Sequence, residues 1–263
     1  MKTQNLPFTK VQSLGNDFIL LNFLNIKNKK KLPQKTISYL CNRHFGIGAD
    51  GILLLTQKNK TPHVQIFNAD GTQAELCLNG ARCVSYYLYK THNFPKQFTF
   101  TMGNSTLTAK IIETKNGIEV LNKIEMPRYV GTKTVLGHTG HVIDSGNPHF
   151  VIFSNVTHDW LKQNGKKIES HPSFLNKTNV EFVHKLKKNI YELFVFERGC
   201  GITLACGSGA CAALCALFEL KKVKEKEKVV FQMLGGKLLC WLEDGFVHLQ
   251  ANAHLVFEGK VGG

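Results

Sequence analysis

The sequence has no apolar run long enough to cross a membrane. The longest uninterrupted one covers residues 210–218, far short of the roughly 18–20 residues that a membrane-spanning helix needs. The N-terminal segment, residues 1–12, also has no apolar stretch typical of a signal peptide. We therefore expect a cytoplasmic protein without a membrane partner, in a reducing compartment that keeps its cysteines as thiols.

Several short motifs of other protein classes are also missing. The eight cysteines form no C-x-x-C pair, which disfavours a zinc ribbon and a thioredoxin-type site. There is no P-loop, and no Gly-rich turn leads from a strand into a helix as nucleotide-binding folds require. Nothing in the sequence predicts a nucleotide cofactor.

Acidic residues are few: 19 Asp and Glu stand against 33 Lys and Arg, which gives a formal net charge of +14. A nucleic-acid site would need these cations on one face. The lysines instead concentrate in stretches typical of solvated loops and helix ends, at 27–31, 185–188 and 221–228. We expect a basic surface that favours small anions, and no nucleic-acid partner.

What the chain does have is an internal repeat. Its 263 residues, 43% of them hydrophobic, suffice for one large domain or two small ones. Cys77-Leu-Asn-Gly-Ala recurs as Cys206-Gly-Ser-Gly-Ala, and Gly15-Asn16 recurs as Gly146-Asn147, at nearly the same offset. We expect two halves of the same plan, residues 1–125 with Cys77 and residues 126–263 with Cys206.

Each half contains several strand-like runs around one helix. The runs are residues 51–55, 64–67, 97–102 and 107–112, then 149–153, 180–183, 191–196, 229–233 and 237–242. One helix starts near Gly80, and its counterpart starts near Gly209 and is apolar nearly all round, so it should be buried. Edge helices are expected at 34–42 and 159–163. The predicted class is α+β, with two pseudo-symmetric halves, each a curved, mostly antiparallel sheet wrapped around a central helix.

Two of the cysteines differ from the rest. Small buried apolar residues are the default interpretation of Cys41, Cys83, Cys211, Cys215 and Cys240. Cys77 and Cys206 instead lie in turns just before a helix, where unpaired N–H groups and the helix dipole stabilise a thiolate and lower its pKa. The same N–H groups bind carboxylates.

If a pseudo-twofold axis relates the halves, the two thiols face each other across one cleft. One thiolate can then remove a proton from one face of a carbon while the opposite thiol protonates the other face. The product is the inverted stereocentre. The N–H groups would stabilise the enolate-like charge, and such a reaction needs no cofactor in principle.

Motifs along the whole chain resemble those of diaminopimelate epimerase. They are Gly15-Asn16-Asp17-Phe18, Arg43 with Gly46-Ile-Gly-Ala-Asp50, Phe67-Asn-Ala-Asp-Gly71, Cys77-x-Asn79-Gly80-Ala-Arg82-Cys83, Gly146-Asn-Pro-His149, Asn179-Val180, Glu197-Arg198-Gly199 and Ala205-Cys-Gly-Ser-Gly-Ala210. The resemblance implies conversion of LL-2,6-diaminoheptanedioate to the meso isomer in lysine and peptidoglycan-precursor biosynthesis. It also implies a homodimer that uses no pyridoxal phosphate and no metal.

The resemblance also implies a role for each matching residue. Cys77 and Cys206 would be the acid/base pair, with His149 and Glu197 near the reacting centre, holding the amino group or tuning the thiols. The backbone at Leu78, Asn79, Gly207 and Ser208 would bind the reacting carboxylate. The remaining substrate-binding residues would be Asn16, Asn68, Asn147, Asn179, Glu197 and Arg198, with Arg198 on the distal carboxylate, because an Arg–carboxylate pair suits a diacid.

Two positions depart from the family pattern, both beside the cysteines. Leu78 stands where the family has Gly, which adds strain if that position needs φ > 0. Ile202 stands where the family has Glu, so a carboxylate is missing near the second thiol. The alternatives are another pyridoxal-phosphate-independent racemase or epimerase of the same fold, a weakened or inactive homologue, and a basic binding protein without catalysis. The two retained thiols disfavour the last.

Overall fold

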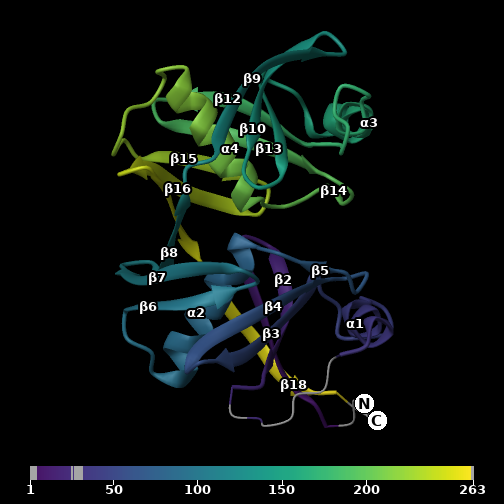
Figure 1. Ribbon diagram of the computed structural model, residues 1–263, viewed down its shortest axis with the longest axis vertical. Helices are drawn as coiled ribbons and strands as arrows, with labels where there is room; N and C mark the ends of the chain where they lie inside the picture. Colours follow the sequence, from purple (N-terminus) through teal and green to yellow (C-terminus); the bar gives the residue numbers. More distant parts are fainter. Residues whose placement is uncertain (1–4, 25, 27–31, 262–263) are drawn as a thin grey trace. The chain divides into compact units, whose positions relative to one another are not determined.

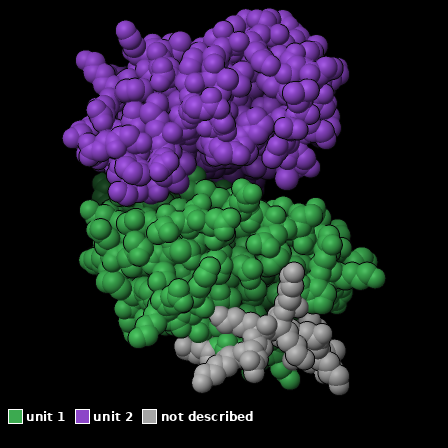
Figure 2. All heavy atoms as spheres, in the orientation of Figure 1, with its two compact units in different colours: residues 1–122, 251–263 green, residues 123–250 purple. Residues whose placement is uncertain are grey.

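The computed structural model describes residues 5–24, 26 and 32–261. Its contacts divide the chain into two compact units (Figure 2). Unit 1 comprises Met1–Asn122 with Ala251–Gly263, and unit 2 comprises Lys123–Gln250.

Unit 1 is a sheet with two helices. The strands run in the order β18 (His254–Lys260), β1 (Pro7–Ser13), β2 (Asn16–Asn22), β3 (Gly51–Lys58), β4 (Thr61–Asn68), β6 (Gln97–Met102) and β7 (Ser105–Thr114); β5 (Gln73–Ala74) pairs with the end of β4, and β8 (Gly117–Glu125) follows β7. The pairings β2–β3 and β4–β6 are parallel. Helix α1 (Gln34–Cys41) lies between β2 and β3 in sequence, and α2 (Leu78–His92) lies between β5 and β6.

Unit 2 has the same plan. Its strand order is β9 (Arg128–Val135), β10 (His138–Asp144), β11 (Pro148–Phe153), β12 (Asn179–Lys187), β13 (Ile190–Glu197), β15 (Val229–Met233), β16 (Gly236–Glu243) and β17 (Phe246–Asn252), with β14 (Gly201–Ile202) paired to the end of β13. Helix α3 (His158–Glu169) connects the parallel pair β11–β12, and α4 (Gly207–Glu219) precedes β15. The expected fold class is confirmed.

In each unit one helix lies inside the sheet (Figure 1). Helix α2 contacts β18, β1, β2, β3 and β7, whereas α4 contacts β9, β10, β11, β12 and β16. Helices α1 and α3 cover the other face, so that Ile52 and Leu54 of β3 pack in a cluster with α1 while Leu53 points at α2. β3 is therefore buried on both faces, as is typical of strands between two helix layers.

The last strand of the chain belongs to the first unit. β18 pairs antiparallel with β1 and takes the place that β9 takes beside β10 in unit 2. The contact units therefore differ from the sequence division at 125/126, because the C-terminal residues complete the sheet of unit 1 instead of extending the second half.

All strand-like runs of the sequence analysis lie in strands, and all four expected helices are present. The central helices begin at Leu78 and Gly207, two residues before Gly80 and Gly209, because each cysteine is itself the N-cap. Helix α3 extends to Glu169, since Leu161 and Ile168 bury one of its faces. No predicted run corresponds to β1, β2, β5, β8, β9, β10, β14, β17 or β18.

The predicted burial of the cysteines is confirmed. Cys41, Cys83, Cys211, Cys215 and Cys240 are buried, and none of the eight cysteines, all of them described, forms a disulfide. The expected burial of the second central helix is confirmed as well, because α4 is buried along nearly its whole length. None of the helices among the described residues is long and apolar enough to span a membrane.

The repeat allows a matched test of how independently the units fold. Phe100 of β6 and Phe231 of β15 are both 0% exposed and occupy equivalent strands. We expect Phe100→Ala and Phe231→Ala each to destabilise their own unit by about 3–5 kcal/mol through cavity formation. Hydrogen exchange read by mass spectrometry should show faster exchange in the substituted unit only.

Leu186→Ala is the control, because this side chain is 47% exposed on β12. Equal loss of protection in both units from one substitution would show that the chain unfolds as a single cooperative body.

Candidate functional site

Cys77 is the N-cap of the central helix of unit 1. Its backbone is extended, with φ −143° and ψ 114°, and its thiol accepts a hydrogen bond from the Gly80 N–H at 3.4 Å. The first-turn N–H groups of a helix have no acceptor within the helix, so they point toward the side of the thiol. A Cβ at Gly80 would lie 2.9 Å from Leu53, which explains the small residue at this close approach to β3.

Asn16 connects the first strands to this thiol. Its Oδ1 lies 3.7 Å from the Cys77 Sγ, which donates to it, and accepts a second hydrogen bond from the Asn79 Nδ2 at 3.2 Å. The fully buried Arg82 donates to the Asn79 Oδ1 and to the Ser13 hydroxyl, so Asn79 is held from both sides. Of the predicted residues in unit 1, the structure thus brings Asn16, Cys77 and Asn79 together.

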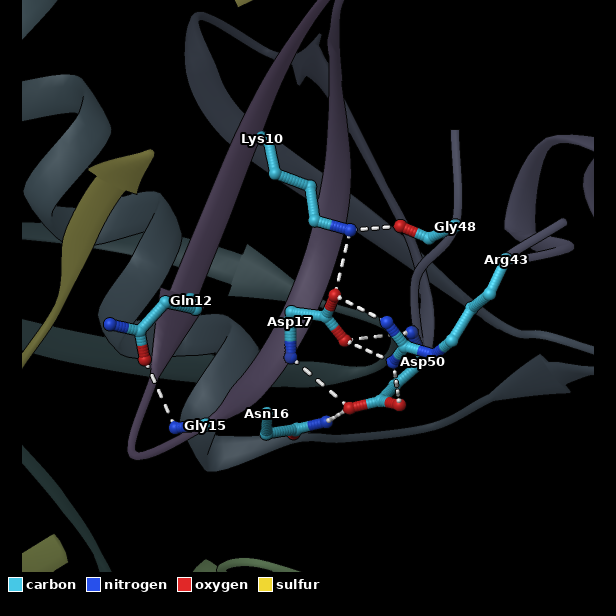
Figure 3. A network of polar contacts seen from close by, with 8 residues as sticks. All are labelled: Lys10, Gln12, Gly15, Asn16, Asp17, Arg43, Gly48 and Asp50. Atoms are coloured by element: carbon cyan, nitrogen blue, oxygen red, sulfur yellow. Dashed lines mark hydrogen bonds and ion pairs between the residues drawn. The ribbon is translucent and has the colours of Figure 1, made fainter. Parts of the chain in front are cut away.

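A network of charged groups fixes Asn16 from behind (Figure 3). The Asp50 carboxylate accepts from the Asn16 Nδ2 at 2.8 Å, and Arg43 bridges Asp50 and Asp17 at 2.8 and 2.7 Å. The Lys10 ammonium completes the network with an ion pair to Asp17 at 2.7 Å. Burial alone would raise the pKa of Asp17, but the hydrogen bonds from Arg43 and Lys10 outweigh it and lower that pKa to about 2.

The other two predicted residues of unit 1 are Asn68, at the end of β4, and Leu78, at the start of α2. Asn68 ends β4 and donates to the Thr72 hydroxyl at 3.0 Å, in an exposed turn. Leu78 is the first residue of α2 and is 4% exposed. It is not among the residues with positive φ, so the backbone at Leu78 needs no glycine, and the strain considered for this departure is absent.

Cys206 occupies the equivalent place in unit 2. It is the N-cap of α4, with φ −126° and ψ 115°, and its thiol accepts from the Gly209 N–H at 3.4 Å. The Ser208 hydroxyl lies 3.4 Å from the same sulfur. Glu197, at the end of β13, hydrogen-bonds the Cys206 thiol and accepts from the Thr203 hydroxyl at 2.7 Å.

The expectation that the helix N-terminus lowers the pKa of this cysteine is wrong for Cys206. Burial, followed by the charge of Glu197, raises the pKa of the Cys206 thiol well above its usual value. The hydrogen bonds from Ser208 and Gly209 act in the opposite direction and are outweighed. Burial also raises the pKa of Glu197. The Cys206 thiol is therefore harder to ionise than an ordinary cysteine.

His149 and Asn147 form a second cluster of predicted residues. The His149 Nε2 lies 3.1 Å from the Asn147 Oδ1, and its Nδ1 lies 2.6 Å from the Glu181 Oε1. His149 is 0% exposed. The charges of Glu181 and His149 both act on the pKa of Glu197, which places this cluster close to the Cys206 half-site.

Asn179 and Arg198 are coupled through the backbone. The Arg198 N–H donates to the Asn179 Oδ1 at 2.9 Å, and the Asn179 Nδ2 donates to the Pro148 carbonyl at 2.9 Å. Arg198 and Asn147 both line a cavity of about 470 Å³ on unit 2. Its other cationic lining residues are Arg128, Lys133 and Lys177.

Ile202, the second departure, packs against the apolar cluster beneath α3. Ile202 of β14 pairs with Phe196 of β13, the residue directly before Glu197. Glu197 therefore keeps a carboxylate beside Cys206 even though position 202 carries none.

Five polar residues near the two thiols have no role predicted from the sequence: Asp17, Arg43, Asp50, Glu181 and Thr203. Asp17, Arg43 and Asp50 lie within the quoted motifs, and only the folded sheet brings them together. Glu181 could have been found from the sequence, because it is an acidic residue inside the buried strand run 179–183.

Gly46, Gly48 and Gly51 do match the spacing G-x-G-x-x-G, but they lie between α1 and β3 and open no helix. Among the described residues, no group of three or more His, Cys, Asp or Glu is placed to hold a metal ion.

The Asp17 network predicts a pH-dependent contribution to stability. Because the pKa of Asp17 in the folded protein, about 2, is below its ordinary value, its ion pairs stabilise the fold above about pH 4 and are lost as the pH falls toward 2. We expect Asp17→Asn to lower the free energy of unfolding by about 1–2 kcal/mol at pH 7, with a difference that shrinks toward pH 2. Urea denaturation at several pH values measures it.

Asp159→Asn, an exposed carboxylate on α3, is the control for the same chemical change. A loss of stability from Asp17→Asn that is the same at pH 7 and near pH 2 would contradict the electrostatic interpretation.

The fold is shared with solved structures of low sequence identity. A phenazine biosynthesis protein of the PhzF family from Bacillus anthracis superposes with a TM-score of 0.77 at 11% identity, over 98% of this chain and 99% of that chain. A hydroxyproline epimerase from Agrobacterium vitis, solved with bound trans-4-hydroxy-L-proline, matches with a TM-score of 0.65 at 12% identity, over 97% and 92%.

Similarity in sequence identifies the family more specifically than similarity in fold. A family model described as diaminopimelate epimerase matches residues 8–124 and 141–250. Diaminopimelate epimerases from Phocaeicola vulgatus and Carboxydothermus hydrogenoformans are 36% and 37% identical, over 97% of this chain and 98% and 99% of their own lengths. The chain belongs to the diaminopimelate epimerase family.

Proposed function

We propose that this protein is a cofactor-independent epimerase that converts LL-2,6-diaminoheptanedioate to the meso isomer, in lysine and peptidoglycan-precursor biosynthesis in the cytoplasm. The observation that carries the proposal is the repeated cysteine cap. Cys77 and Cys206 begin the two central helices with the same extended backbone and the same N–H donor three residues later. Membership of the family supports the substrate and the reaction.

In the proposed mechanism the two thiols act on opposite faces of one carbon. A thiolate takes the α-proton and becomes a thiol, the electron pair passes into the carboxylate as an enolate-like anion, and the opposite thiol protonates the other face. One proton is removed and one is delivered, so that the thiols end with exchanged protonation states.

The start of each central helix provides the electrostatic stabilisation. The N–H groups of Leu78 and Asn79 in one unit, and of Gly207 and Ser208 in the other, belong to first turns without acceptors in the helix. We propose that they bind the reacting carboxylate, whose charge grows as the proton leaves. Preorganised donors of this kind are the largest single contribution in many enzymes that form oxyanions.

The remaining polar residues would hold the rest of the substrate. Asn16, Asn68, Asn147 and Asn179 would bind its polar groups, with His149 and Glu197 at the amino group of the reacting centre. Arg198 would bind the distal carboxylate. The cationic lining of the cavity that Arg198 shares with Asn147 suits a substrate with two carboxylates.

A second candidate activity is that of another amino-acid racemase or epimerase of the same fold, as the hydroxyproline epimerase illustrates. Leu78 and Ile202 are the positions that would shift the specificity or weaken the enzyme. A mono-acid substrate would leave Arg198 without a carboxylate to bind, so the observations favour the diacid.

The mechanism predicts that both thiols are indispensable. In heavy water under reducing conditions, the wild-type protein should convert the LL isomer to the meso isomer with deuterium at the inverted carbon. We expect Cys77→Ala and Cys206→Ala each to lower turnover by about 10²–10⁴-fold, because each removes one of the two proton-transfer groups. NMR and chiral chromatography measure both quantities.

Cys200→Ala is the matched control, since Cys200 is exposed and belongs to neither half-site. Near-wild-type turnover in either of the first two variants would disprove the two-thiol mechanism. No exchange in the reduced, folded wild-type protein with this substrate would disprove the proposed activity.

We also propose that the protein is a homodimer. The exposed apolar side chains of β18, Val256 and Phe257, are 54% and 49% accessible and support this strand as part of the contact. Light scattering should then give twice the chain mass of 29.5 kDa. Val256→Lys together with Phe257→Lys should give the single-chain mass, whereas an unchanged mass would place the contact elsewhere.

A further inference from the structure

The side chain of Asn16 lies between a carboxylate and a second amide. Its Nδ2 donates to the Asp50 Oδ2 at 2.8 Å (Figure 3), and its Oδ1 accepts from the Asn79 Nδ2 at 3.2 Å. The Asn79 Oδ1 accepts in turn from the Arg82 guanidinium. A single chain of hydrogen bonds therefore runs from Arg82 on α2, through two amides, to Asp50 before β3.

The two ends of this chain of hydrogen bonds determine which way both amides are turned. A guanidinium has only donors, so the atom of Asn79 beside Arg82 is the oxygen. An ionised carboxylate has only acceptors, so the atom of Asn16 beside Asp50 is the nitrogen. Arg43 donates to the same carboxylate at 2.8 Å, in keeping with a group that only accepts. With either amide turned over, two donors or two acceptors would face each other.

The carbonyl oxygen of Asn16 therefore faces the thiol of Cys77. Its Oδ1 lies 3.7 Å from the Cys77 Sγ, and the thiol donates to it. The Gly80 N–H donates to the same sulfur at 3.4 Å from the start of α2. These two contacts act in opposite directions, because an N–H donor stabilises a thiolate and a carbonyl oxygen stabilises the protonated thiol.

We propose that Asp50 and Arg82 are positioning residues of the first half-site: from opposite ends they hold the Asn16 amide with its oxygen toward Cys77, and this oxygen raises the basicity of the Cys77 thiolate. A helix N-terminus alone makes a thiolate easy to form but weakly basic. Proton abstraction from carbon is faster with a stronger base. The effect on turnover rests on the proposed epimerase function, whereas the orientation of the amide does not.

The same orientation also suits the substrate-binding role proposed for Asn16. A side-chain amide nitrogen carries two N–H groups. Asp50 accepts from one of them, so the amide has a second donor to offer to a substrate carboxylate. In this orientation Asn16 can therefore serve the thiol with its oxygen and the substrate with its nitrogen.

Each end of the chain of hydrogen bonds is sufficient to hold the Asn16 amide. In Asp50→Asn the amide is still held from the side of Arg82, and in Asn79→Asp it is still held by Asp50. The double variant Asp50→Asn/Asn79→Asp moves the carboxylate to the opposite end, where it favours the reversed amide at an unchanged net charge. Arg82 itself is kept, because it is fully buried and its removal would also disturb the fold.

Charge has to be separated from orientation, because several titratable or charged groups surround the amides. They are Lys10 of β1, Asp17 of β2, Arg43 and Asp50 between α1 and β3, and Arg82 and Cys83 of α2. Each single variant changes the charge near Cys77 and leaves the amide in place. A double-mutant cycle therefore isolates the effect of the turned amide as the part that does not add.

The first test follows the alkylation of Cys77 by iodoacetamide at several pH values, by mass spectrometry of the peptide that contains it. Only the thiolate reacts, so the midpoint of this profile reports the basicity of the thiolate. We expect the midpoint of the double variant to lie about one pH unit below the sum of the two single effects, or about tenfold faster alkylation at pH 7. The reason is that the turned amide donates an N–H to the sulfur.

Cys200 is exposed and serves as the internal reference, since its profile should be the same in the wild type and in all three variants. A mere loss of rigidity would raise the alkylation rate at high pH, where the thiol is fully ionised, and would leave the midpoints additive. Midpoints that add within experimental error would therefore overturn the proposal, whatever the rate at high pH.

The second test measures turnover of LL-2,6-diaminoheptanedioate by the same proteins. We expect kcat of the double variant to be about tenfold below the product of the two single effects, because a less basic thiolate removes the α-proton more slowly. Glu113→Gln is the matched control for a carboxylate-to-amide change and should leave kcat unaltered, since Glu113 is on β7 and pairs with Lys96 at 3.0 Å. Single effects that account fully for the double variant would overturn the role in proton transfer.

The two tests separate the possible failures. If alkylation shows the excess shift but the wild-type protein does not turn over this substrate, the proposed function fails and the positioning of the amide stands. If the wild-type protein turns over the substrate and both cycles are additive, the positioning proposal fails and the function stands.

Discussion

The architecture depends on the N-terminus of a helix that is buried inside a sheet. Each unit encloses one helix within a sheet, and the first turn of that helix leaves N–H groups without acceptors. A cysteine caps this turn in both units, with its sulfur bonded to the third N–H. The thiol is therefore held at a position where the local dipole favours negative charge, and the surrounding strands can supply the polar groups that it needs.

The strands supply different groups to the two caps. Around Cys77 the contacts are amides, with Asn16 and Asn79 held by charged residues behind them. Around Cys206 they are the Ser208 hydroxyl and the Glu197 carboxyl group, and burial with the charge of Glu197 raises the pKa of the thiol. The same frame therefore carries two unequal half-sites.

Much of the fold could be predicted from the sequence because the chain contains a repeat, so that the elements expected in one half can be checked against the other half. The runs around Cys77 and Cys206 agree in spacing. Apolar runs such as 51–55 are short, and this length favours a strand buried on both faces over a buried helix. Two of the strands that were not predicted, β9 and β18, are of another kind. β9 and β18 lie at the outer edge of each sheet and expose most of their residues, so they lack an apolar alternation that would reveal them.

The sequence by itself determined the duplication, the fold class, the two capping cysteines and the family. These depend on local spacing and on residue types that recur at fixed offsets. The tertiary structure alone decided that β18 completes unit 1, that Leu78 is unstrained, and that the pKa of Cys206 is raised. It also decided that Glu181 meets His149 across two parallel strands. The physical reason is that burial and long-range pairing outweigh the local helix dipole, and neither can be read from neighbours in the chain.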